Sequence, residues 1–279
     1  MGYLIKSEKL GPSWGFKDLW FLYNGAKDWV DGGLYNHTGT FKDVEVKAYA
    51  GHEMPTIISA GNVARAYTCF HPVHLISPGS ALSRLWVPEF ICLRYTLAVI
   101  INATYKDLEP YKKLNPTNKY INDEFRVKAY AEDFAQFEAP DYFFQAVGSG
   151  IGIKAAKSVW GKSTQYMASK ITGPQIFADV LSGPVDPDVC ERVTMIEPPA
   201  AERCLKELKK AEGINALPPV GVALRHLQGR MDIDKNAKIM LHITGADLDY
   251  IWDNYPITQL SPTKRMWRHE LDETIFHSS

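Results

Sequence analysis

The 279 residues are 46% hydrophobic and 23% charged, with a formal net charge of −1 at neutral pH. A chain of this length buries a sizeable core, in one large domain or two modest ones. The near-neutral balance supplies no basic field for a nucleic acid or a membrane surface, so we expect neither as a partner. The apolar runs, such as 97–101, are strand-sized and too short to cross a bilayer.

The cysteines and histidines suggest no metal site and no disulfide framework. Cys69, Cys92, Cys190 and Cys204 are scattered without Cys-x-x-Cys spacing, which favours a reducing cytoplasm. His71 and His74 flank Pro72 without a second cluster of ligands, so we expect no metal there. The amino terminus lacks the charged start and long apolar core of a signal peptide.

Two similar short sequence motifs occur early in the chain. Gly15-Phe16-Lys17-Asp18 precedes the apolar run 19–23, which predicts a strand and leaves Lys17 as an edge or surface lysine. Thr38-Gly39-Thr40-Phe41-Lys42-Asp43 instead combines a Gly/Thr turn with helical spacing of apolar residues, and predicts a helix from Lys42 to near Gly51.

The position of Lys42 at a helix start favours a specific kind of reactivity. The positive end of the helix dipole and partial burial should both lower its pKa and free the amine, as a Schiff-base lysine requires. The alternative is an ordinary solvated helix lysine.

Strands and helices alternate through the rest of the chain. We expect strands at 55–59, 73–77, 97–101, 142–147, 193–196 and 237–244, and helices at 62–70, 123–137, 151–160, 200–212 and 220–227. Pro198-Pro199 opens one of these helices and Gly213 ends it. This alternation predicts an α/β fold with mostly parallel sheets. The last thirty or so residues suggest a docking extension.

A glycine-rich turn lies between the strand at 142–147 and the helix after it. Gly148, Ser149, Gly150 and Gly152 would direct backbone N–H groups and a hydroxyl toward one spot at a helix start, which is how proteins bind phosphate. The alternative is a tight connection with no ligand.

Several segments together resemble a known family. Runs 38–45, 59–66 and 142–150 stand in the order expected of pyridoxal-phosphate enzymes of the tryptophan synthase β type. Within that superfamily the chain is most similar to the cysteate synthase branch, a relative of threonine synthase, by its segments 7–11, 18–20, 23–25, 60–66, 142–150 and 241–245. The resemblance covers about 4–75 and 140–250.

The resemblance implies a role for each candidate residue. Lys42 would hold pyridoxal 5'-phosphate, Asn62 would bond the ring oxygen, the Gly148–Gly152 turn would bind the phosphate, and Thr244 would meet the pyridine nitrogen. Substrate contacts would come from Thr38, Thr40, Ser59, Arg65 and Gln145. From the residues alone, Asn62 is equally a helix N-cap, Thr244 a strand-end threonine and Arg65 a solvated arginine.

The chain also departs from the family pattern. The arginine-rich segment before the phosphate turn is reduced to 124–130, and the region 160–192 is abbreviated. Ile151 stands where a threonine is usual, so one phosphate donor is missing.

These observations predict two α/β domains, fold type II, with the cofactor in the cleft between them. The larger would comprise 1–49 and 136–279, and the smaller 50–135 with Asn62. The implied reaction is β-replacement or β-elimination on O-phospho-L-serine, with sulfite as nucleophile and cysteate as product. The alternatives are threonine-synthase-like conversion of O-phosphohomoserine and a shortened, non-catalytic scaffold. We expect a cytoplasmic homodimer.

Overall fold

The computed structural model describes residues 2–25, 39–49, 55–58, 62–63, 66–67, 71, 73–78, 95–100, 121–172 and 192–246. Its strands are β1 (Tyr3–Lys6), β2 (Asp18–Tyr23), β3 (Thr56–Ile58), β4 (Val73–Pro78), β5 (Tyr95–Ile100), β6 (Tyr142–Ala146), β7 (Gln165–Ile171), β8 (Val193–Ile196) and β9 (Lys238–Ile243). Its helices are α1 (Leu10–Ser13), α3 (Lys42–Ala48), α6 (Asp123–Phe134), α7 (Ile151–Trp160), α9 (Pro198–Glu212) and α10 (Pro218–Gln228).

The chain divides into two compact units. The first combines Met1–Val44 with Arg126–Asn254, and the second combines Glu45–Phe125 with Tyr255–Ser279. The boundaries lie within α3 and α6. The domain limits predicted from sequence stay a prediction.

The first unit is built on a six-stranded sheet in the order β1-β2-β9-β6-β7-β8. Only the β1–β2 pair is antiparallel, and all the other neighbours are parallel. The expected α/β fold with a mostly parallel sheet is therefore confirmed. The strands at its centre are near-continuous apolar runs because helices cover both of their faces.

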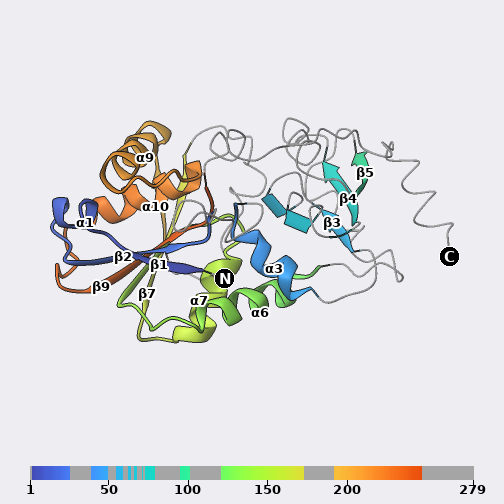
Figure 1. The fold of residues 1–279 in the computed structure, drawn as a ribbon, viewed down its shortest axis with the longest axis horizontal. Helices are drawn as coiled ribbons and strands as arrows, with labels where there is room; N and C mark the ends of the chain where they lie inside the picture. The colour runs from blue at the N-terminus through green and yellow to red at the C-terminus, as the bar shows by residue number, and fades with distance from the viewer. Residues whose placement is uncertain are drawn as a thin grey trace. The chain divides into compact units, whose positions relative to one another are not determined.

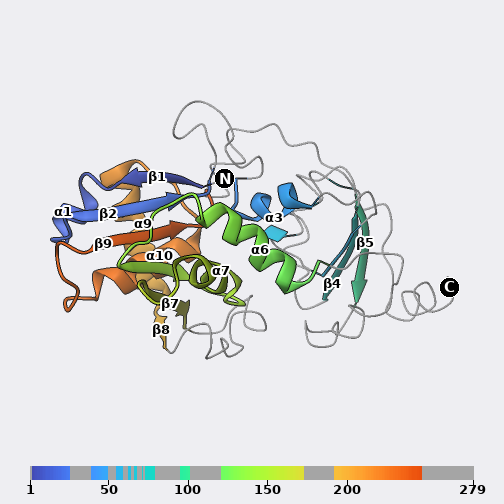
Figure 2. The same ribbon diagram turned by 90° about the horizontal axis from the view of Figure 1, so that it is seen from below.

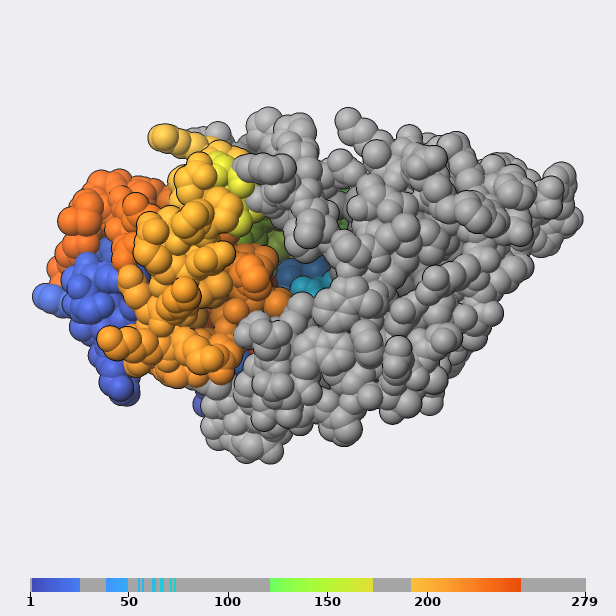
Figure 3. Space-filling model, turned by 90° about the horizontal axis from the view of Figure 1, so that it is seen from above, coloured from blue at the N-terminus to red at the C-terminus, as the bar shows by residue number. Residues whose placement is uncertain are grey.

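Side chains alternate between two cores across this sheet. Phe144 and Leu241 face the layer of α9 and α10, while Phe143 and Met240 face α6 and α7. Figure 1 shows α9 and α10 on one side of the sheet and α6 and α7 on the other, and Figure 2 shows α6 and α7 side by side over the strands. In Figure 3 α9 and α10 cover their face of this unit, beside the amino-terminal segment in blue.

The second unit contains a parallel three-stranded sheet in the order β3-β4-β5. Residues 62, 63, 66 and 67 are helical, as expected for the segment that begins at Asn62. Tyr49 lies against Tyr67, His71 and Phe125 in edge-on ring contacts. Among the described residues, no helix is long and apolar enough to cross a membrane.

Two strands of the first unit were not expected from the sequence. β1 is short and antiparallel at the sheet edge, and its burial does not alternate cleanly. β7 contains Gln165, Ser169 and Lys170, and Ser169 and Lys170 are buried although their side chains are polar. The sequence pattern predicts no element at 165–171, where tertiary packing overrides a polar local pattern and forms β7.

Candidate active site

Three predicted segments meet at the carboxyl edge of the six-stranded sheet. Thr244 directly follows β9, Gly148 follows β6 by two residues, and Asn24 directly follows β2. Because β2, β9 and β6 are neighbouring parallel strands, their carboxyl ends lie at the same edge. Open α/β sheets bind their ligands at such edges.

The segment that carries Lys42 is fastened to this edge. Thr40 and Gly245 form an isolated antiparallel bridge. The Phe41 N–H donates to the Thr244 carbonyl at 3.0 Å, and the Ala246 N–H donates to the Gly39 carbonyl at 2.8 Å. A Cβ at Gly245 would lie only 2.9 Å from that Gly39 carbonyl oxygen, so the close approach of the two backbones requires glycine.

Lys42 is the first residue of α3, as predicted. Its backbone N–H donates to Thr40 Oγ1 at 3.0 Å, so the expected hydroxyl cap is present. Its Nζ donates to the Tyr130 hydroxyl on α6 at 3.2 Å and lies 4.0 Å from the centre of the Phe41 ring. The Tyr130 hydroxyl and the Phe41 and Tyr130 rings are therefore neighbours of the lysine amine. Whether Thr40 also contacts a substrate stays a prediction.

A buried polar chain joins the central strands just beneath this lysine segment. We use this name for Gln145, His242, Asn24 and Asp133. Gln145 Nε2 donates to His242 Nδ1 at 3.0 Å, His242 Nε2 donates to Asn24 Oδ1 at 2.8 Å, and Asn24 Nδ2 donates to Asp133 Oδ2 at 3.3 Å. Asp133 also accepts two bonds from the backbone N–H of Gly2. Side chains from β6, β9 and α6 and from the residue after β2 are thus connected through one hydrogen-bonded path.

His242 is the centre of this chain and remains neutral. Burial lowers its pKa to about 3, and the nearby positive charge of Lys42 adds to that effect. The ring is 1% exposed and lies edge-on to Phe41 at 5.2 Å between centroids. A neutral imidazole suits both bonds, since Nδ1 accepts one and Nε2–H donates the other.

The glycine turn leads into α7 as predicted. Gly150 precedes the first helical residue with φ of +81°, a left-handed conformation that favours glycine, and its carbonyl accepts from the Lys154 N–H at 3.0 Å. The first N–H groups of a helix have no acceptor within the helix, and the dipole there favours an anion. Gly148 is half-buried and Ser149 is exposed, so the turn can receive a ligand.

Gly152 has a further packing role. A Cβ at this position would lie 2.4 Å from Gln145 Nε2. The glycine therefore makes room for the amide that starts the buried polar chain. Gln145 is itself 3% exposed, and its predicted contact with a substrate stays a prediction.

The other predicted residues lie elsewhere. Asn62 is half-buried and belongs to the second unit. Thr38, Ser59 and Arg65 lie outside the described residues. Lys17 is exposed, as expected of a surface lysine. Within the described ranges, no group of three or more acidic, histidine or cysteine side chains could hold a metal ion.

Sequence reasoning missed Tyr130, His242, Asn24 and Asp133 as members of the site. A signal existed for His242, which interrupts the apolar run 239–243 of β9. Tyr130 offered none, because its contact with Lys42 spans 88 positions of sequence.

Comparisons with known proteins support the resemblance of the sequence. No protein-family profile matches the chain. A cysteate synthase of Methanocella paludicola is 22% identical over 92% of this chain and 78% of its own length, and one of Methanoregula boonei is 25% identical over 85% and 73%.

Solved structures share the fold at low identity. A hydrogen sulfide-producing enzyme of Fusobacterium nucleatum has a TM-score of 0.63 and 15% identity over 89% of this chain and 96% of its own. Maize serine racemase has a TM-score of 0.62 and 16% identity over 90% of both chains.

Proposed function

We propose that this chain, which has the fold of the pyridoxal-phosphate enzymes of fold type II, eliminates or replaces a leaving group on the β-carbon of an amino acid. Because the chain is similar to cysteate synthases over most of its length, we take O-phospho-L-serine, the substrate implied by the sequence resemblance, as the proposed substrate. The observation that carries the proposal is the position of Lys42, fastened by the Thr40–Gly245 bridge to the strand end that carries Thr244.

The described residues fit a cofactor that bears a phosphate and a carbonyl. The start of α7, with Gly150 in a left-handed conformation, supplies backbone N–H donors for a phosphate. Lys42 supplies the amine that would hold the carbonyl carbon, and Thr244 supplies a neutral hydroxyl at the end of β9 for the pyridine nitrogen. Asn62 is the proposed partner of the ring oxygen. Bound pyridoxal phosphate would supply the electron sink that lets bonds to the substrate α-carbon break.

The chain's own groups prepare Lys42 for proton transfer. The Tyr130 hydroxyl, 3.2 Å from Nζ, holds the amine in place. His242 stays neutral above about pH 3, so it adds no second positive charge beside Lys42 at physiological pH. Lys42 Nζ is then the group that takes the proton from the substrate α-carbon.

One alternative reaction remains for the same site, and one alternative role remains for the chain. The site would also suit γ-elimination and hydration of O-phosphohomoserine, as in threonine synthases. The segments 124–130 and 160–192, which are abbreviated relative to the family pattern, leave the identity of the substrate anion open between these alternatives. A non-catalytic scaffold would retain the fold without using Lys42. The homodimer, the cytoplasmic location and the domain limits 1–49 with 136–279 and 50–135 stay parts of this proposal.

The test compares Lys42 with Lys17, two lysines that lie in similar sequence motifs. Wild type, Lys42→Ala and Lys17→Ala are saturated with pyridoxal phosphate, desalted and reduced with borohydride. Peptide mass spectrometry then locates the pyridoxyl group. We expect the label on Lys42 in wild type and in Lys17→Ala, and its loss in Lys42→Ala. Tyr130→Phe should retain the label but lower the rate of any reaction in which Lys42 moves a proton.

The substrate is identified in a second step. Each protein receives O-phospho-L-serine or O-phosphohomoserine, with and without sulfite, and phosphate release and products are measured. Phosphate release from phosphoserine by wild type and not by Lys42→Ala supports the proposed reaction. Release from phosphohomoserine alone selects the threonine-synthase-like alternative. Failure of wild type to retain the cofactor would contradict the enzyme assignment and favour the scaffold.

A further inference from the structure

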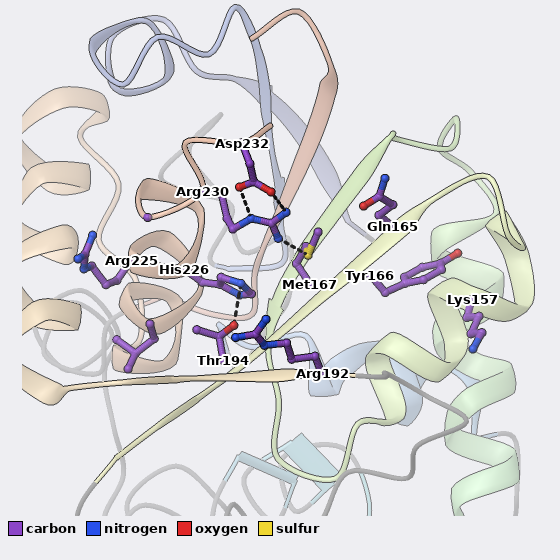
Figure 4. A pocket seen from close by; sticks show the side chains of 12 residues that line it. Lys157, Gln165, Tyr166, Met167, Arg192, Thr194, Arg225, His226, Arg230 and Asp232 are labelled. Carbon is purple, nitrogen blue, oxygen red and sulfur yellow. Dashed lines mark hydrogen bonds and ion pairs between the residues drawn. The ribbon is translucent and has the colours of Figure 1, made fainter. Parts of the chain in front are cut away.

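A second polar region of the first unit lies along β7 and β8, at the end of the sheet opposite β1. A cavity of about 720 Å³ opens between the start of β7, β8 and the end of α10. Figure 4 shows the side chains that line it. Tyr142 and Gln165 pair at the first positions of β6 and β7, and at about 3.3 Å per residue they lie roughly 20 Å before the Gly148 turn. The cavity therefore begins at the amino end of β7 and extends along β8 to Ile196, the last residue of that strand.

The cavity exists because β8 is shorter than β7. The pairing of β7 with β8 starts only at Ala168, opposite Val193. Residues 165–167 extend β7 beyond that start, and they line the cavity together with Thr194 and Ile196 of β8. The shortened strand leaves an opening at the sheet edge large enough for a small organic molecule.

Four cationic side chains line this opening. They are Lys157, Arg192, Arg225 and Arg230, and among the lining residues that the structure describes Asp232 is the carboxylate. Asp232 accepts two bonds of 2.6 Å from Arg230, whose third nitrogen contacts Met167 Sδ at 3.1 Å. These contacts fix the guanidinium orientation before any ligand binds, which lowers the entropy cost of binding.

His226 lies between Arg230 and Arg192 in Figure 4, and the residue is 6% exposed. Its Nε2 lies 2.9 Å from Thr194 Oγ1, while the buried Nδ1 has no hydrogen-bond partner among the described residues. Burial lowers its pKa to about 4, and the charges of Arg230 and Arg192 lower it further than the opposing charge of Asp232 raises it. The positive field at this histidine is therefore only partly compensated.

We propose that this basic cavity binds a small organic anion with at least two negative charges, whose oxygens are held by Arg192 and Arg230 beside His226. A carboxylate or a phosphate can accept paired bonds from a fixed guanidinium, and the volume exceeds that of a bare inorganic ion. The site does not depend on the function proposed for the carboxyl edge.

The test is calorimetric titration, in buffer of low ionic strength, of protein already saturated with pyridoxal phosphate. The probes are citrate, inorganic pyrophosphate and glucose, which is uncharged. Arg192→Gln and Arg230→Gln each remove one cationic donor, and Arg203→Gln removes an exposed arginine of α9 that does not line the cavity. We expect anion binding to wild type that weakens roughly tenfold in the first two variants, as loss of a bond to a charged group predicts. Arg203→Gln should bind as wild type does.

The outcomes separate the sources of the anion. Tighter binding of citrate indicates a carboxylate ligand, and tighter binding of pyrophosphate indicates a phosphate ligand. Absence of binding by both anions overturns the proposal, as does binding that Arg192→Gln and Arg230→Gln leave unchanged. Glucose binding as strong as anion binding overturns it as well. Circular dichroism of each variant confirms that a lost affinity is not a lost fold.

Discussion

Two buried histidines in the described part of the first unit, His242 on β9 and His226 on α10, are in opposite circumstances. His242, in the buried polar chain, has both ring nitrogens bonded, to Gln145 and to Asn24. His226, in the basic cavity, has one nitrogen bonded to Thr194 and the other without a partner in the described part of the chain. Burial lowers the pKa of both. One unit therefore carries a histidine with both ring nitrogens bonded and another with a buried nitrogen that has no partner in the described chain.

The largest expected effect comes from removing each imidazole. His242→Leu leaves the Asn24 oxygen and the Gln145 amide without their partner, so the free energy of unfolding should drop by about 3 kcal/mol or more. His226→Leu leaves only the Thr194 hydroxyl without its partner, so the free energy of unfolding should drop by less than about 1 kcal/mol. Urea denaturation measures both values. Equal losses at the two positions would show that the two networks do not differ as described.

Adding one methyl group beside the buried polar chain, and one beside the basic cavity, compares how tightly the two regions are packed. In Gly152→Ala the new Cβ would lie 2.4 Å from Gln145 Nε2, and overpacking of this kind costs about 2 kcal/mol. Gly229→Ala, which lines the basic cavity, places its Cβ no closer than 3.5 Å to any atom. We expect Gly229→Ala to melt near the wild-type temperature and Gly152→Ala to melt well below it. A wild-type melting temperature for Gly152→Ala would refute the need for glycine there.

Acid should weaken the fold through His242. Its folded pKa of about 3 lies below the ordinary value of 6.5, so the unfolded state binds more protons between those values. The stabilisation is complete above pH 6.5 and is lost as pH decreases toward 3, by about 2 kcal/mol between pH 7 and pH 5. Urea denaturation of wild type and of His242→Gln across this pH range measures how much of the stability depends on the protonation of His242. Parallel curves would mean that His242 carries no such linkage.

The smallest expected effect concerns one hydroxyl. Thr40→Val removes the oxygen that accepts the Lys42 N–H, and loss of a helix cap costs about 1 kcal/mol. Thr40→Ser retains the oxygen and should recover most of that stability. Thermal denaturation compares the three proteins, and an equal loss in the serine variant would assign the effect to the missing methyl group.

The sequence predicted those features that depend on neighbours in the chain. The apolar run of β9 and the Pro198-Pro199 start of α9 were local signals, and both elements are present. The helix start at Lys42 and the turn before α7 were equally visible because glycine and hydroxyl residues mark such positions.

The rest depended on contacts between distant residues. His242 bonds to Asn24 across 218 positions of sequence and to Gln145 across 97. The basic cavity arises because β8 pairs with only part of β7, a length mismatch that no local pattern reveals. The polar side chains of β7 gave no local strand signal, and the surrounding sheet made it a strand.

The bridge between Thr40 and Gly245 also has a consequence for the order of folding. It joins positions near opposite ends of the described chain, and β2 itself pairs with β9 over its full length. Contacts of such long sequence separation form slowly because a large loop must close first. During synthesis on the ribosome, about 200 further residues must therefore be added after Lys42 before β9 is available. The Lys42 amine acquires its surroundings only as the unit completes its fold.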